Sequence, residues 1–69
     1  MRRDPVTSST LRSIGYDADT AIMEIEFTNG GIYRFFAVPS SLHRRLLSAD
    51  SKGTFFHLNI RDRYPFARL

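Results

Sequence analysis

Apolar and polar residues alternate along residues 20–28, which is the period of a β-strand that buries one face. The apolar positions of this stretch are Ala21, Met23, Ile25 and Phe27. Glu24 and Glu26 fall on the other face, which we expect to be solvated. Residues 29–31, Asn-Gly-Gly, reach positive φ at low cost, and residues 32–38 are rich in aromatic and branched side chains. The pattern therefore predicts a β-hairpin that turns at residues 29–31.

The charges of the hairpin predict its register. A loop of two residues would place Arg34 opposite Ile25, on the apolar face. A loop of three residues, 29–31, places Arg34 opposite Glu26 instead, on the polar face. We predict this second register, with an exposed ion pair that contributes about 0.2–1 kcal/mol.

The same register separates the apolar residues of the second strand into two sets. Tyr33 and Phe35 face the main core. The residues on the opposite side are Ile32, Phe36 and Val38. Either the C-terminal tail covers that side or it forms a binding surface.

The flanking segments complete an α+β fold. We expect residues 1–9 to form an extended lead-in and residues 11–16 to form a first strand, which gives a three-stranded antiparallel meander. Pro39 ends the last strand and can occupy a first helical turn, with Ser40 or Ser41 as a capping residue. A helix of about ten residues follows, residues 50–53 break it, and a second, shorter helix begins near Ser51 or Thr54. We therefore predict one domain, residues 1–69, with one or two C-terminal helices.

Helical periodicity assigns the faces of these segments. The residues expected to point inward are Leu42, Leu46, Leu47 and Ala49 in the first segment and Phe55, Phe56 and Ile60 in the second. The residues expected to point outward are His43, Arg44 and Arg45.

Charge is unevenly distributed along the chain. Residues 1–38 carry four cations and five anions, whereas residues 39–69 carry six cations and two anions, so the net charge of +3 belongs to the second half. Nine of the ten cations are arginine, whose planar guanidinium pairs well with phosphates and carboxylates. The second half therefore favours an anionic partner.

Composition excludes several classes of site. The chain has no cysteine and only two histidines, so it offers no disulfide and a poor metal site, and no cofactor motif is present. Ser40 and His43 are close in sequence, but at an exposed helix start they are typical of a cap and a surface residue, not of a nucleophile and its base. We expect no catalytic residue. The chain has neither a bilayer-length apolar run nor the order of a secretory signal, so we expect a cytoplasmic protein.

Several short motifs occur together in an order typical of one known family. They are Pro5-Val6-Thr7-Ser8-Ser9, Ile14-Gly15-Tyr16-Asp17, Asn29-Gly30-Gly31, Tyr33-Arg34-Phe35-Phe36-Ala37-Val38-Pro39, Leu46-Leu47, Ser51-Lys52-Gly53, Phe55-Phe56, Ile60-Arg61 and Tyr64-Pro65. Along nearly its whole length the chain resembles a KTSC domain. That family is named for a short domain at the C-terminus of some lysyl-tRNA synthetases, and it also occurs as stand-alone bacterial and phage proteins.

The resemblance implies a small binding module and suggests RNA through the attachment to a tRNA-charging enzyme. The Tyr-x-Tyr motif of the family falls on Tyr33 and Phe35, and Phe35 lacks the hydroxyl, which implies packing at that position. His57 stands where relatives often carry asparagine. Arg61 suits either a functional role or a structural ion pair with Asp17 or Asp62.

Two functions follow from these observations. In the first, RNA or another single-stranded nucleic acid binds to the basic half: Arg44, Arg45, Lys52 and Arg63 contact phosphates, and Phe36 stacks on a base. In the second, the open edge or face of the sheet binds a protein partner or a second copy of the chain. Salt separates them, because phosphate contacts weaken steeply as salt rises and an apolar interface does not.

Overall fold

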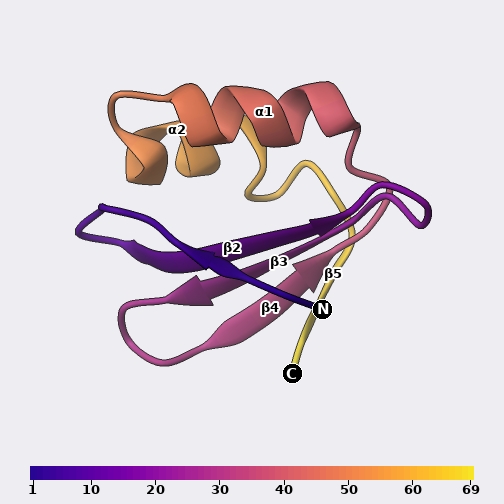
Figure 1. Cartoon of the computed structure of the whole chain (residues 1–69), viewed down its shortest axis with the longest axis horizontal. Helices are drawn as coiled ribbons and strands as arrows, with labels where there is room; N and C mark the ends of the chain where they lie inside the picture. Colours follow the sequence, from indigo (N-terminus) through magenta and orange to yellow (C-terminus); the bar gives the residue numbers. More distant parts are fainter.

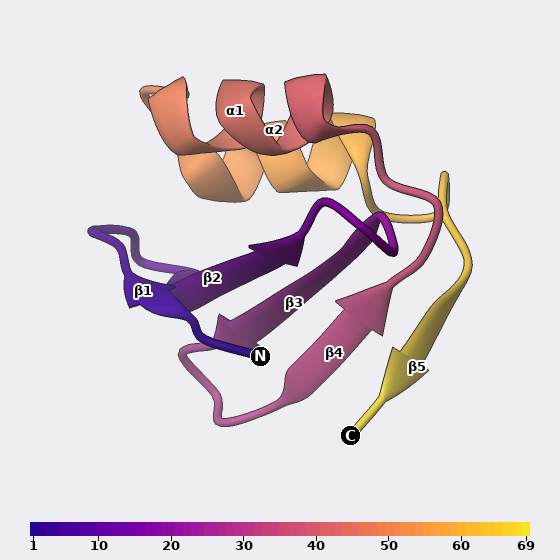
Figure 2. The ribbon, with the colours of Figure 1, turned by 45° about the vertical axis from the view of Figure 1, so that its right-hand side comes forward.

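The hairpin predicted from the alternating pattern lies at the centre of an antiparallel sheet. The computed structural model describes all of residues 1–69 (Figure 1). Its elements are β1 (Asp4–Pro5), β2 (Leu11–Asp17), β3 (Ile22–Phe27), β4 (Ile32–Phe35), α1 (Ser40–Ser48), α2 (Lys52–Asn59) and β5 (Phe66–Arg68). The strands follow the order β1-β2-β3-β4-β5, and both helices cover one face of the sheet (Figure 2). The predicted α+β class is confirmed.

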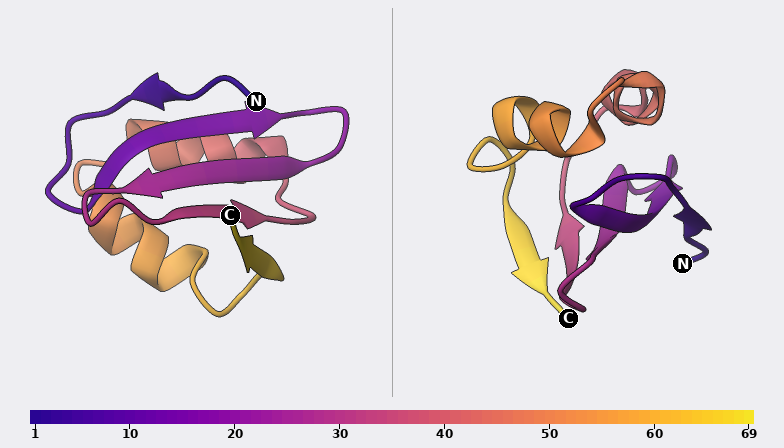
Figure 3. Two further views of the ribbon diagram at one scale, coloured as in Figure 1. Left: turned by 90° about the horizontal axis from the view of Figure 1, so that it is seen from below. Right: turned by 90° about the vertical axis from the view of Figure 1, so that its left-hand side faces the viewer.

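The sheet has five strands instead of the expected three, because the lead-in and the tail each add a short one at an edge. Asp4 and Pro5 pair with β2, and Phe66 to Arg68 pair with β4. The edge of β4 is therefore paired within the chain, and the tail extends the sheet instead of covering its second face (Figure 3).

The hairpin loop has the predicted length of three residues but starts one residue earlier. The Phe27 N–H donates to the Gly31 carbonyl at 2.8 Å, and the Gly30 N–H donates to the Phe27 carbonyl at 2.9 Å, which closes a loop of residues 28–30. Gly30 takes the left-handed position, at φ 94°. Gly31 directly precedes β4, and its N–H donates to the Asn29 side chain at 2.9 Å.

As a result, the predicted pairing of Arg34 is wrong. Arg34 lies opposite Glu24, and Glu26 lies opposite Ile32. The register moves by two residues in total, so every side chain keeps the predicted face and Tyr33 and Phe35 still point towards the helices.

The core fills the space between the sheet and the helices. Its buried residues are Leu11, Ile14, Met23, Ile25, Phe35, Val38, Leu42, Leu46, Phe56 and Ile60. A bulge between Leu11 and Ser13 lets Leu11 and Ile14, three residues apart, point to the same side. Val38 belongs to this core and not, as predicted, to the opposite side of the sheet, because Ala37 adopts a positive φ of 59° that reverses the alternation after β4.

The helices differ from the prediction in three details. Pro39 occupies the cap position of α1 and no side chain caps that helix, so neither Ser40 nor Ser41 has the expected role. Leu47 is 41% exposed and not inward. His43 is not outward: its ring stacks on Tyr16 with centroids 4.7 Å apart, which joins α1 to β2. The start of α2 follows the prediction, since Ser51 caps it by accepting a hydrogen bond from the Thr54 N–H at 3.3 Å.

Candidate nucleic-acid interface

Three of the four predicted phosphate ligands lie on the two helices, and the fourth, Arg63, follows α2. Arg44 and Arg45 are exposed on α1, and the Arg45 guanidinium lies 5.3 Å from the centre of the Phe55 ring on α2. Lys52 begins α2 and donates to the Ala49 carbonyl at 3.4 Å, so Arg45 and Lys52 both lie beside the connection between the helices. Arg63 follows the other end of α2, where it donates to the Leu58 carbonyl at 3.0 Å. Cations therefore stand at both ends of this helix.

None of the six cations in residues 39–69 forms an ion pair. The three ion pairs of the structure join Arg2 to Asp4, Arg3 to Glu24, and Arg34 to Glu24. All of them lie in the first half of the chain. The structural ion pair considered for Arg61 is thus absent, and Arg61 is exposed. The cations of the second half keep donors that no carboxylate occupies, as phosphate binding requires.

The predicted stacking residue Phe36 forms no cation–π contact with these cations, since the two such contacts of the structure join Arg45 to Phe55 and Arg68 to Tyr33. It follows the last residue of β4, is half-buried, and its N–H donates to the Pro65 carbonyl at 2.9 Å. The ring is not part of the aromatic cluster described next.

A groove of about 590 Å³ lies between α2 and the strands β4 and β5. Its apolar lining consists of Phe27, Tyr33, Phe35, Phe56 and Phe66, and its polar lining consists of Thr10, His57, Arg61 and Asp62, with Gly53 between them. Figure 3 shows that the chain leaves α2 and returns alongside β4 as β5, and residues of all three elements line the groove. Long-range pairing of the tail is therefore what builds this site.

The rings of the groove contact one another. Phe56 meets Phe35 edge-on with centroids 5.4 Å apart, which anchors the inner wall in the core. Phe66 lies 5.9 Å from Tyr33 and 6.0 Å from Phe35, yet 56% of it is exposed. The guanidinium of Arg68 lies 5.7 Å from the centre of the Tyr33 ring. Exposed aromatic surface beside unpaired arginine suits a ligand that is both planar and anionic.

Four residues of this groove were missing from the predicted site or left without a role, namely Tyr33, His57, Arg61 and Phe66, and so was Arg68, which lies over the Tyr33 ring. The sequence carries a signal for them only in the resemblance, which aligns Tyr33, His57 and Arg61 with recurring positions of the family. Nothing in the local pattern indicates that Phe66 and Arg68 would pair with β4, because that contact joins residues more than thirty positions apart.

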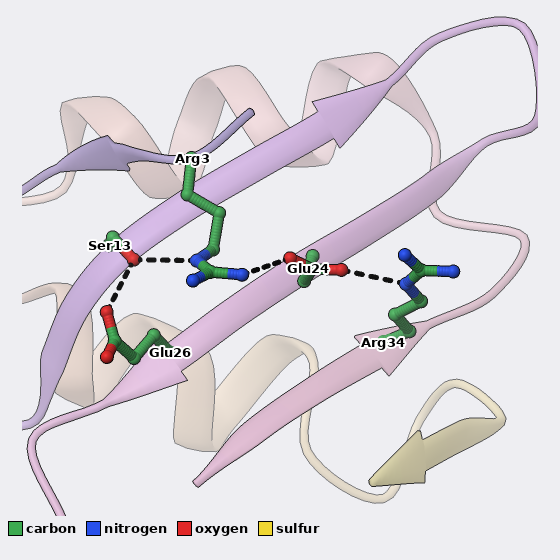
Figure 4. Close-up of polar contacts among 5 residues, drawn as sticks. All are labelled: Arg3, Ser13, Glu24, Glu26 and Arg34. Atoms are coloured by element: carbon green, nitrogen blue, oxygen red, sulfur yellow. Dashed lines mark hydrogen bonds and ion pairs between the residues drawn. The ribbon is translucent and has the colours of Figure 1, made fainter. Parts of the chain in front are cut away.

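The face of the sheet away from the helices, the helix-free face, carries a polar network. Glu24 is only 2% exposed, so the expected solvated position is wrong for this residue. Arg3 from the lead-in and Arg34 from β4 reach its two carboxylate oxygens, with Arg34 Nε at 2.8 Å (Figure 4). Arg3 also donates to Ser13 Oγ at 3.0 Å, and this hydroxyl donates to Glu26 at 3.0 Å.

The two arginines keep the buried Glu24 side chain charged. Burial alone would raise the pKa of Glu24, but the hydrogen bonds and charges of Arg34 and Arg3 outweigh it and hold the pKa below its ordinary value of 4.5. The side chain is thus an anion held between two cations, and the network explains the lead-in's position across β2. Arg3 and Arg34 are both paired with Glu24, so this network offers little unpaired charge to a ligand.

Ser40 and His43, the pair considered from the sequence, contact other residues, and Ser40 Oγ accepts a hydrogen bond from Arg44 at 3.3 Å. His43 is held by Tyr16, whose hydroxyl donates to the Val38 carbonyl at 2.6 Å. Burial, and then the charge of Arg44, lower the pKa of His43 below 6.5. No group of side chains in the structure could hold a metal ion, and no helix is long and apolar enough to cross a membrane.

Comparison with known proteins places this arrangement in context. The model of the KTSC domain family matches residues 7–64. A crystal structure of a KTSC domain protein from Yersinia pestis superimposes with a TM-score of 0.96 at 40% sequence identity, covering 99% of this chain and 96% of that one. An uncharacterized protein of Stutzerimonas stutzeri is 47% identical over 83% of this chain and 80% of its own length.

The chain is also similar to part of a larger enzyme. A lysine–tRNA ligase of Nostoc punctiforme is 34% identical over 88% of this chain. That alignment covers 11% of the length of the ligase, so the similarity concerns one small segment of it.

Proposed function

The chain belongs to the KTSC domain family, and from this membership together with the unpaired cations we propose that it is a non-catalytic module that binds RNA or other single-stranded nucleic acid. The observation that carries the proposal is that cations form ion pairs only in the first half of the chain. Those of the first half include the three that form ion pairs, whereas Arg44, Arg45, Lys52, Arg61, Arg63 and Arg68 have no carboxylate partner.

The cations and the aromatic groove complement each other chemically. Modules that bind single strands combine a positively charged surface for the backbone with aromatic rings on which bases stack. In this protein Arg45 and Lys52 precede or begin α2, and Arg61 and Arg63 follow its end, so a strand that runs along α2 meets a cation at each end of the helix. The similarity to a segment of a lysine–tRNA ligase supports RNA as the ligand.

Binding of short single-stranded RNA and DNA, measured by fluorescence anisotropy, tests this proposal. We expect the double variant Arg44→Ala/Arg45→Ala to bind more weakly than wild type. With about 0.7 counterions released per phosphate contact on a single strand, the loss of two contacts makes the negative slope of log K against log salt shallower by about 1.4.

The control variant is Arg2→Ala/Arg12→Ala, which removes the same charge from the first half of the chain. Arg2 is paired with Asp4, and Arg12 donates to the Thr28 carbonyl at 3.2 Å. We expect this control to keep the wild-type salt slope. Equal weakening by both variants would mean that net charge alone attracts the strand and would remove the proposed interface.

A further inference from the structure

We propose that the groove between α2 and the strands β4 and β5 seats one unpaired base of the bound strand, with Phe66 as its stacking surface and Arg61 and Arg68 beside the adjoining phosphates. This inference rests on the proposed function and specifies the site that would carry it.

Phe66 has the exposure that a stacking residue needs. Its ring centre lies 5.9 Å from that of Tyr33 and 6.0 Å from that of Phe35, and the residue remains 56% exposed. The rings beneath it are fixed, because Phe35 is buried and packs edge-on against Phe56 of α2. Phe66 thus offers exposed aromatic surface beside a packed aromatic cluster.

Charge at the groove selects an anionic planar ligand over a purely apolar one. Arg61 lines the groove at the end of α2, and Arg68 lies over Tyr33 at the edge of β5. Both lack a carboxylate partner, and Asp62 is the single acidic residue of the lining. A nucleotide matches this arrangement with its base on the rings and its phosphates towards the two guanidiniums.

The volume and polar lining agree with one nucleotide. About 590 Å³ lies within the range of about 300–1,000 Å³ typical of small-molecule pockets. The hydroxyl of Tyr33 forms no hydrogen bond within the protein, and His57 is exposed at the rim. These groups, with Thr10 and Asp62, can bond to the edge of a base, whereas Phe35 offers packing alone.

A scan with abasic strands tests the inference directly. In a short RNA that binds wild type, each nucleotide in turn is replaced by an abasic one. We expect one position, or one repeated position, to weaken binding by about 5- to 150-fold, which corresponds to about 1–3 kcal/mol for one stacked base. Phe66→Ala should weaken the intact strand by a similar factor and should lose nothing further with the abasic strand.

Leu58→Ala is the control, because Leu58 is also an exposed apolar residue, at 58%, but does not line the groove. Tyr33→Phe keeps the ring and removes only the hydroxyl, so it tests the base-edge contact in a variant that preserves the packing.

Three outcomes would overturn the inference. If Phe66→Ala and Leu58→Ala bind the intact strand equally well while its affinity depends on salt, the proposed function stands and the groove does not seat a base. Equal weakening of intact and abasic strands by Phe66→Ala would likewise exclude a seated base. Absence of binding by any strand at low salt would remove the proposed function, and the base site with it.

Discussion

Replacing Glu24 by glutamine removes the one charge that two arginines share on the helix-free face. Glu24 is 2% exposed, and its carboxylate accepts from Arg3 and Arg34, whose side chains are 26% and 38% exposed. A hydrogen bond to a charged group contributes about 1.5–3 kcal/mol, against about 0.5–1.5 kcal/mol for a neutral one. Two such bonds are weakened, partial exposure of the arginines screens the effect, and we expect a loss of about 2 kcal/mol.

Urea denaturation at pH 7 measures this loss, and thermal unfolding gives a second reading. For a chain of this size about 1 kcal/mol lowers Tm by about 4–8 °C, so Glu24→Gln should melt about 8–16 °C below wild type. The matched control is Glu26→Gln, which alters the same strand and the same charge. Glu26 accepts only from Ser13 and is half-buried, so its loss should stay below about 1 kcal/mol.

The dependence on pH provides a further check on the cause. The pKa of Glu24 is lowered in the folded state, so its ion pairs stabilise the fold above 4.5 and this contribution disappears as pH falls through the folded value. The difference between wild type and Glu24→Gln should therefore shrink below pH 4.5. A loss at pH 7 no larger than that of Glu26→Gln would refute the assigned role of the network.

Three other predictions concern the lead-in, the helix layer and the groove. A Cβ at Gly15 would overlap the carbonyl oxygen of Arg2, so Gly15→Ala should displace the lead-in and cost about 1–3 kcal/mol, measured by urea denaturation; wild-type stability would contradict this close approach. The pKa of His43 is lowered by burial and by Arg44, so the unfolded chain binds its proton more readily and stability should fall as pH drops below 6.5; His43→Gln should flatten that slope, and an unchanged slope would exclude His43 as its source. Phe66→Ala should keep the wild-type Tm within about 4 °C, because its ring is more than half exposed; a larger drop would show that this ring supports the core.

The faces of the hairpin were predictable because they depend on alternation, which the sequence displays directly. Its pairing was not, because a loop that begins one residue earlier changes every cross-strand partner while it preserves every face. The left-handed residue could have been either glycine, and the side chain of Asn29 decides for Gly30. The side of Val38 was predicted wrongly for a related reason: it depends on the positive φ of Ala37, which the sequence pattern does not indicate.

The site likewise combines a feature that the sequence shows directly with features that depend on long-range contacts. The basic second half is visible in composition, and the structure adds that its cations have no carboxylate partners. The groove depends on β5, whose three residues join β4 across more than thirty positions, and no local pattern specifies such a contact. The burial of Glu24 is similarly non-local, because it requires Arg3 to cross Gly15.

The salt dependence of single-stranded RNA binding by the wild-type chain tests the central claim most directly. If the four predicted cations Arg44, Arg45, Lys52 and Arg63 each contact a phosphate, log K should fall against log salt with a slope of about −2.8 or steeper, a loss of at least about fifty-fold between about 50 and 200 mM. Absence of binding at the lower concentration, or binding that does not change with salt, would contradict it.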